Sequence, residues 1–111
     1  MVLVHHVGRN SGKEYITPLV YLPSDAGDGA MYIFASKGGA PEHPAWYRNL
    51  VEHQLVELQD EASKGDYTVR EASGDERAVW WQRAIEVWPD YATYQTKTDR
   101  QIPVLVLEPV N

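Results

Sequence analysis

The chain has 111 residues, 43% hydrophobic and 23% charged, which predicts one globular domain over residues 1–111 with a modest core. The absence of cysteine excludes disulfides and thiol chemistry, and a net charge of −6 argues against a nucleic-acid partner. No signal peptide and no apolar run long enough to span a bilayer is visible, so we expect a cytoplasmic protein.

Three strands are expected in the first third of the chain, over 2–7, 14–22 and 31–36. The polar turn 8–13 contains two glycines and predicts a hairpin of the first two strands. Pro18 has no N–H, so it indicates a sheet edge or a bulge in the second strand.

The stretch 35–50 links the third strand to a first helix over 44–52. Gly38 and Gly39 allow a tight turn or a close approach to a ligand, and Pro44 suits the first helical turn. Backbone N–H groups beside Lys37 would favour an anionic, planar ligand. An ordinary strand-to-helix connection with a buried Trp46 explains the same residues.

The second half predicts strands over 54–59 and 66–72 and a last, central strand over 102–107. Ser73 and Glu76 form a capping-box pattern before a second helix. Its apolar face is expected at helical spacing, at Trp81, Ala84, Ile85 and Trp88. Pro89 ends or kinks this helix, and residues 90–96 suit a further helical turn.

These elements predict an α+β, mainly β fold: a six-stranded antiparallel barrel with two to three helices. The starting hairpin and the lack of regular strand–helix alternation argue against a doubly wound parallel sheet.

The turn 8–13 resembles a P-loop, but it is one residue short, Glu14 replaces the needed Ser or Thr, and a strand follows it. Arg9 and Lys13 on this turn are candidates for holding a phosphate; a solvated hairpin tip explains them equally well. Four histidines at 5, 6, 43 and 53 lack metal-ligand spacing, so we expect no metal site. Ser36 lacks the surroundings of a hydrolase nucleophile.

The chain contains four Trp and seven Tyr, more aromatic surface than a small core requires. Trp88, Tyr91 and Tyr94 form a stripe that is typical of core packing. Because a buried tyrosine hydroxyl needs a partner, a pocket wall that faces a substrate is the alternative.

Taken together, the motifs resemble the deazaflavin-dependent nitroreductases of actinobacteria, also called F420H2-dependent quinone reductases. The matching segments span nearly the whole chain: GRNSG at 8–12, TPL at 17–19, ASKGGA at 35–40, HPAWY at 43–47, NL at 49–50, WP at 88–89, Tyr91, YQ at 94–95, TDR at 98–100 and IP at 102–103.

This resemblance implies a split β-barrel of the flavin-nucleotide-binding type and coenzyme F420, an 8-hydroxy-5-deazaflavin. It implies cofactor-binding roles for Arg9, Asn10, Ser11, Lys13, Thr17, Pro18, Leu19, Val20, Phe34, Ala35, Ser36, Lys37, Gly38, Gly39, Ala45, Trp46, Tyr47, Arg48, Asn49 and Tyr91. Tyr91 and Tyr94, with Trp88, would line the substrate side, and backbone amides near Ser36 would stabilise developing negative charge.

The chain departs from the family pattern at three positions. Asn10 stands where relatives often have Lys, Tyr15 where some have Arg, and Trp88 where the nitroimidazole-reducing relative has Tyr. The first two changes weaken the expected grip on an anionic tail, and the third puts drug activation in doubt. The N-terminal extension of many relatives is not part of this sequence.

The function expected is hydride transfer from the reduced deazaflavin to a quinone or nitroaromatic acceptor, with a tyrosine as general acid. Two alternatives stay open: a non-enzymatic coenzyme carrier, and a split-barrel binder of flavin mononucleotide or haem. We expect a monomer or homodimer, with at most peripheral contact at the inner face of the membrane.

Overall fold

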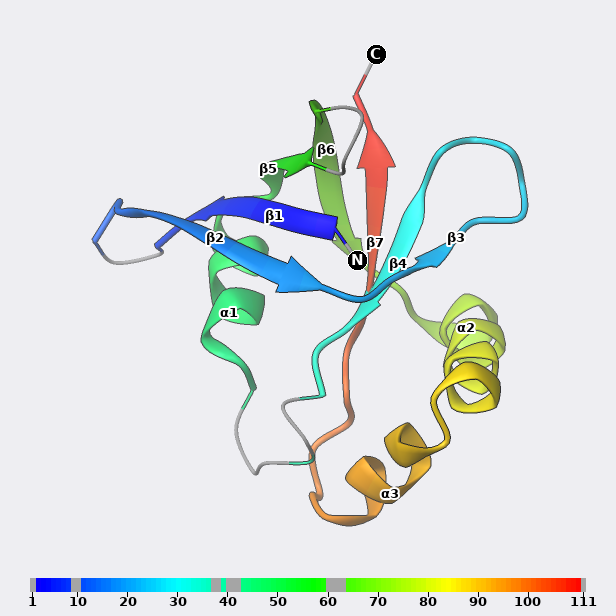
Figure 1. The fold of residues 1–111 in the computed structure, drawn as a ribbon. Helices are drawn as coiled ribbons and strands as arrows, with labels where there is room; N and C mark the ends of the chain where they lie inside the picture. The colour runs from blue at the N-terminus through cyan, green and yellow to red at the C-terminus, as the bar shows by residue number, and fades with distance from the viewer. Residues whose placement is uncertain (1, 9–10, 37–38, 40–42, 60–63, 111) are drawn as a thin grey trace.

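The protein folds into one curled antiparallel sheet with helices at its sides, in a computed structural model that describes residues 2–8, 11–36, 39, 43–59 and 64–110 (Figure 1). Within these residues seven strands run in the order β2-β1-β5-β6-β7-β4-β3. The strands are β1 (Val2–Val7), β2 (Glu14–Leu19), β3 (Leu22–Pro23), β4 (Met31–Phe34), β5 (Leu55–Gln59), β6 (Lys64–Glu71) and β7 (Val104–Pro109). The helices are α1 (Ala45–Glu52), α2 (Gly74–Val87) and α3 (Asp90–Thr96).

The predicted second strand is broken in two, which corrects the expected count of six strands. β2 ends at Leu19 and pairs with β1 at one end of the sheet. β3 pairs with β4 at the other end. Because only Val20 and Tyr21 join them, the two ends of the sheet must approach each other, and the sheet curls into an open barrel (Figure 1).

The core has two parts, one on each face of the central strand β7. Leu105 and Leu107 belong to a cluster that also contains Val4 of β1 and Leu50 of α1. Val104 and Val106 belong to an aromatic cluster against α2 and α3. Burial on both faces explains why β7 is apolar without alternation, as the sequence predicts for a central strand.

Most of the aromatic excess packs the core. Trp80 of α2 lies parallel to Tyr32 of β4, with ring centroids 3.8 Å apart. The guanidinium of Arg83 lies 4.4 Å from the Trp80 ring and pairs with Asp25 at 2.8 Å. The sequence pattern missed Trp80, the most buried tryptophan of α2; Trp81, Ile85 and Trp88 pack against the same cluster while partly exposed.

The predicted capping box does not form. Ser73 is the N-cap of α2, but its side chain makes no capping hydrogen bond. Glu76 instead accepts bonds from Arg70 at 2.6 and 2.9 Å and from the Tyr32 hydroxyl at 3.0 Å. The arginine on β6 competes successfully for this carboxylate because a bidentate charged contact is stronger than a backbone cap.

Candidate functional site

Two cavities lie side by side between the β1–β2 hairpin, α1, the end of β4 and α3, and both are lined by Trp46. The hairpin cavity has a volume of about 440 Å³ and is lined by His6, Gly8, Ser11, Tyr15, Ile16, Thr17, Ala45, Trp46 and Asn49. The strand-end cavity has a volume of about 270 Å³ and is lined by Pro18, Leu19, Val20, Ile33, Phe34, Ser36, Trp46 and Tyr91. We call the two together the groove.

The hairpin turn places a serine at the mouth of the hairpin cavity. Gly8 donates its N–H to the carbonyl of Lys13 at 2.8 Å, which closes the turn. The Ser11 hydroxyl accepts a bond from the Lys13 N–H at 3.2 Å. A Cβ on Gly8 would lie only 2.7 Å from this hydroxyl, so glycine is what lets Ser11 lie over the backbone.

A chain of three polar side chains, two of them buried and one partly buried, lines the hairpin cavity. The Asn49 amide donates to His6 Nδ1 at 3.2 Å. His6 Nε2 lies 2.8 Å from the hydroxyl oxygen of Thr17. His6 and Asn49 are both buried, at 5% and 7% exposure. Burial lowers the pKa of His6 below its usual 6.5, so the imidazole is neutral at physiological pH.

Arg100 does not line the strand-end cavity, but it holds the backbone of the chain segment that does. Arg100 donates to the carbonyl oxygens of Ala35 at 3.0 Å and Ser36 at 2.6 Å, and to His43 Nδ1 at 3.1 Å. The Ala35 N–H is bonded to the Pro103 carbonyl at 3.0 Å. The chain after β4 is therefore held on both sides where Ser36 lines the groove.

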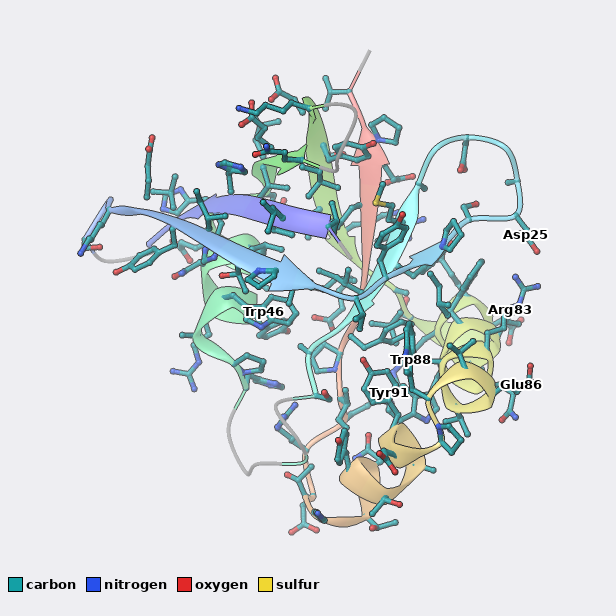
Figure 2. The ribbon with its side chains drawn as sticks, in the orientation of Figure 1. Asp25, Trp46, Arg83, Glu86, Trp88 and Tyr91 are labelled. Carbon is teal, nitrogen blue, oxygen red and sulfur yellow. The ribbon has the colours of Figure 1, made fainter. Side chains whose placement is uncertain are left out.

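Tyr91 closes the strand-end cavity from α3. It is 8% exposed, and its ring lies 5.6 Å from Phe34 and 5.9 Å from Trp81. Burial, with a smaller contribution from Tyr94, raises the pKa of its hydroxyl, so the phenol is protonated at neutral pH. Figure 2 shows Tyr91 and Trp46 on opposite sides of the groove, which α3 and α1 supply respectively.

Tyr47 supports the groove without lining it. Its hydroxyl donates to Glu71 of β6 at 2.6 Å, and burial and this bond raise its pKa to about 12. The His43 ring lies 4.5 Å from the Tyr47 ring. This contact connects the start of α1 to the residues that Arg100 holds.

The structure brings together many of the residues that the resemblance implicates. The groove contains Ser11, Thr17, Pro18, Leu19, Val20, Phe34, Ser36, Ala45, Trp46, Asn49 and Tyr91. Lys13, Ala35, Gly39, Tyr47, Arg48 and Tyr94 are not among its lining residues. Arg9, Asn10, Lys37 and Gly38 lie outside the described residues.

Sequence reasoning assigned no role in a site to His6, Ile16, Ile33 or Arg100. The signal for His6 was present: Val2, Val4 and His6 alternate on one face of β1, so the histidine points inward with two core valines. Arg100 is held by contacts with residues more than fifty positions away, which no local pattern indicates.

The groove suits a long ligand with one planar, apolar part and one polar part. Aromatic and aliphatic side chains line most of the strand-end cavity, and the hairpin cavity adds hydroxyl, imidazole and amide groups beside its own apolar side chains. Among the described residues no group of His, Asp or Glu side chains gathers to hold a metal ion. A curled antiparallel sheet with such a groove defines the protein as a split β-barrel.

Comparison with known proteins agrees with this class. A model of the F420H(2)-dependent quinone reductase family matches residues 1–109. Rv1261c of Mycobacterium tuberculosis, named F420H(2)-dependent quinone reductase, is 36% identical over 96% of this chain and 71% of its own length. Rv3178 of the same bacterium is 35% identical, over 97% and 88%.

Solved structures give the same result. An F420-H2 dependent reductase (FDR-A) is 44% identical, with a TM-score of 0.83 over 96% of this chain and 92% of that one. A domain-swapped dimer is also 44% identical, with a TM-score of 0.84 over 96% and 78%. A haem storage protein of Vibrio cholerae, at 13% identity and a TM-score of 0.68, shares the fold alone.

The chain belongs to the F420H(2)-dependent quinone reductase family, and it is an F420H2-dependent oxidoreductase. Its cofactor is coenzyme F420. The expected split β-barrel is confirmed, with seven strands in place of six. No described helix has the length and apolar character needed to cross a bilayer.

Proposed function

We propose that the groove binds F420H2 and a quinone acceptor together, and that the protein catalyses hydride transfer between them. The observation that carries this proposal is that Trp46 lines both cavities, one of which offers hydroxyl, imidazole and amide groups while the other offers mainly aromatic and aliphatic side chains. The bound coenzyme supplies the hydride, and the protein supplies binding, orientation and exclusion of water.

The residues of the groove fit the two parts of the coenzyme. Leu19, Ile33, Phe34 and Trp46 offer apolar surface for a planar ring system. Ser11, Thr17 and Asn49 offer polar groups for its side chain, beside the first turn of α1. The unpaired N–H groups of a helix start favour negative charge, which suits an anionic tail.

Tyr91 is the group best placed to act on the acceptor. Its raised pKa keeps the hydroxyl protonated, so it can donate a hydrogen bond to an acceptor oxygen and later a proton. Ser36 lies in the same cavity, where Arg100 holds its backbone. Tyr94 contacts Tyr91 at 5.9 Å between ring centroids and is assigned a supporting role.

The test is a titration of the protein with F420, followed by oxidation of F420H2 by menadione. We expect saturable binding and a rate of oxidation that the protein accelerates. Trp46→Leu should weaken binding at least tenfold because both cavities lose a shared wall, whereas Leu55→Ala, at an exposed position, should not. A protein that binds F420 but slows its oxidation would be a carrier and would overturn the proposal. Nitroaromatic compounds serve as a second acceptor class in the same assay.

We infer that the protein is a monomer or a homodimer, which light scattering in solution decides. One relative at 44% identity is described as a domain-swapped dimer. The cytoplasmic location, with at most peripheral membrane contact, stays a prediction that cell fractionation checks.

A further inference from the structure

We propose that His6 is a positioning residue: it directs the Thr17 hydroxyl to donate a hydrogen bond into the hairpin cavity, where this donor selects a hydrogen-bond acceptor group of the coenzyme. The inference rests on the proposed binding of F420 in the groove. It assigns a role to a buried histidine to which the proposed hydride transfer gives none.

The polarity of the chain Asn49–His6–Thr17 follows from its first bond. The Asn49 amide nitrogen can only donate, so His6 Nδ1 must accept and carries no proton. The one proton of the neutral ring is then on Nε2, which donates to the Thr17 oxygen 2.8 Å away. Each step fixes the direction of the next.

Thr17 is thereby left with its own hydrogen to donate. Its bond with His6 is the one side-chain hydrogen bond that Thr17 makes within the described residues. Thr17 lines the hairpin cavity and is only partly buried. The Thr17 oxygen accepts from His6 with one lone pair and keeps its hydrogen to donate, so the group that takes up this hydrogen is an acceptor, such as a carbonyl, a phosphate oxygen or an ionised hydroxyl.

We call the hydrogen-bonded chain Asn49–His6–Thr17 the relay. The groups around His6 keep its imidazole neutral, with the proton on Nε2. Tyr15 of β2 stacks on its ring with centroids 5.7 Å apart, and Asn49 covers it from α1. His6 also borders a second hollow, together with His5, Glu14 and Glu57. No acidic side chain pairs with His6 among the described residues; Glu57 lies 3.9 Å from His5 instead.

Protonation would break the relay at its first bond. A charged imidazole donates from both nitrogens, so Nδ1 could no longer accept from Asn49. Burial lowers the pKa of His6, which places this event below pH 6.5. Nε2 still donates to Thr17 in the charged ring, but Nδ1 now opposes the amide of Asn49, which lines the same cavity, so we expect affinity for the coenzyme to be full above pH 6.5 and to fall as the pH drops through the pKa of His6.

The first experiment measures F420 dissociation constants for Thr17→Val, His6→Phe and the double variant. Valine keeps the shape of threonine without its donor, and phenylalanine keeps the stack on Tyr15. We expect each single variant to bind about tenfold more weakly, and the double variant no more weakly than either. The matched control is His5→Phe, on the adjacent, opposite-facing position of β1, which should change affinity less than twofold. Additive losses in the double variant would overturn the relay.

The second experiment determines the tautomer of His6 in the absence of the coenzyme. Nitrogen-15 NMR of the folded protein shows which nitrogen of His6 carries the proton. We expect Nε2; a proton on Nδ1 would reverse the polarity and overturn the proposal.

The third experiment compares affinities between pH 5 and 8 in the parent protein and in His6→Phe. Ionisations of F420 itself are common to both proteins and cancel in the ratio. We expect the affinity of the parent relative to His6→Phe to fall below pH 6.5, and a constant ratio would count against the relay. Absence of F420 binding by the parent would overturn the proposed function, whereas parent binding that Thr17→Val leaves unchanged would overturn the relay alone.

Discussion

Burial decides the protonation state of the side chains that line or support the groove. It raises the pKa of Tyr91, so this phenol stays a donor, and it lowers the pKa of His6, so this imidazole keeps one free lone pair. The pKa of His43 is also lowered, by burial first and then by Arg100 and Arg48. All three side chains are therefore neutral hydrogen-bonding groups at neutral pH.

Tyr91→Phe tests the proton donor. We expect kcat/KM for a quinone to fall about tenfold or more while the F420 dissociation constant stays close to that of the parent, since the ring still fills the cavity wall. Stopped-flow oxidation of F420H2 and a binding titration give the two values. Tyr67→Phe, on β6 and not among the groove's lining residues, is the control and should act like the parent. Parent-like quinone reduction by Tyr91→Phe would remove its role as proton donor.

Arg100→Lys tests whether the hydrogen bonds from Arg100 to the carbonyls of Ala35 and Ser36 hold the chain after β4 in place. Lysine keeps the charge but loses the planar fork that reaches two carbonyls and His43, so we expect the free energy of unfolding to fall by about 1–3 kcal/mol. F420 affinity should fall with it. Urea denaturation measures the stability, with Asp25→Asn as control, because its exposed ion pair with Arg83 is worth about 1 kcal/mol or less. A loss of unfolding free energy no larger than that of the control would show that these Arg100 hydrogen bonds do not stabilise the fold.

At the scale of elements, the sequence predicts where most strands and helices lie. It does not predict which strands pair or which side chains meet between elements. The hairpin turn and the central β7 follow from glycine placement and an unbroken apolar run. Pro18 indicates an edge or a bulge in this strand but not a break at Val20 and Tyr21, which both suit a strand; the pairing of β3 with β4 decides where the strand breaks. Glu76 was assigned to a cap because Arg70, on a neighbouring element, cannot be seen in the local pattern.

Gly39, in the connection after β4, lies close against the backbone of α3. Gly39 has φ +81°, as the sequence predicts for a tight turn, and it is buried. A Cβ there would lie 2.5 Å from the Tyr94 carbonyl oxygen and 3.0 Å from the Lys97 Cβ. The close approach that the glycine permits is thus to the backbone of α3, the helix that carries Tyr91.

Gly39→Ala should therefore destabilise the protein more than its backbone conformation alone requires. Gly27→Ala is the matched control, since Gly27 has φ +73° and a Cβ added there would meet nothing within 4 Å. Both variants carry the left-handed penalty of roughly 1 kcal/mol, and only Gly39→Ala adds the clash with α3. Thermal unfolding compares them, and equal losses of stability would show that α3 moves away at no cost.

At the scale of the whole molecule, the curl of the sheet is what forms the groove. β2 and β4 lie at or near opposite ends of the strand order, yet Leu19 and Phe34 line the same cavity. The family motifs predicted these residues as neighbours, whereas the residues alone could not, because the closure depends on seven strands pairing in order. The two-residue link at Val20 and Tyr21 connects the two ends, and the core cluster that contains Val4 of β1 and Ile33 of β4 packs them together.

Two histidines, His6 and His43, make the stability of the folded protein depend on pH. His6 and His43 both have pKa values lowered below 6.5 in the folded protein, so the unfolded chain binds protons more readily. Their contribution to stability is complete above pH 6.5 and is lost as the pH falls through their folded pKa values. We expect the melting temperature of the parent to drop between pH 7 and pH 5, and the double variant His6→Phe, His43→Phe to show a shallower slope. His53→Gln, at an exposed position, is the control and should keep the parent slope. A double variant with the parent slope would mean that the acid sensitivity arises outside the groove and its supporting residues.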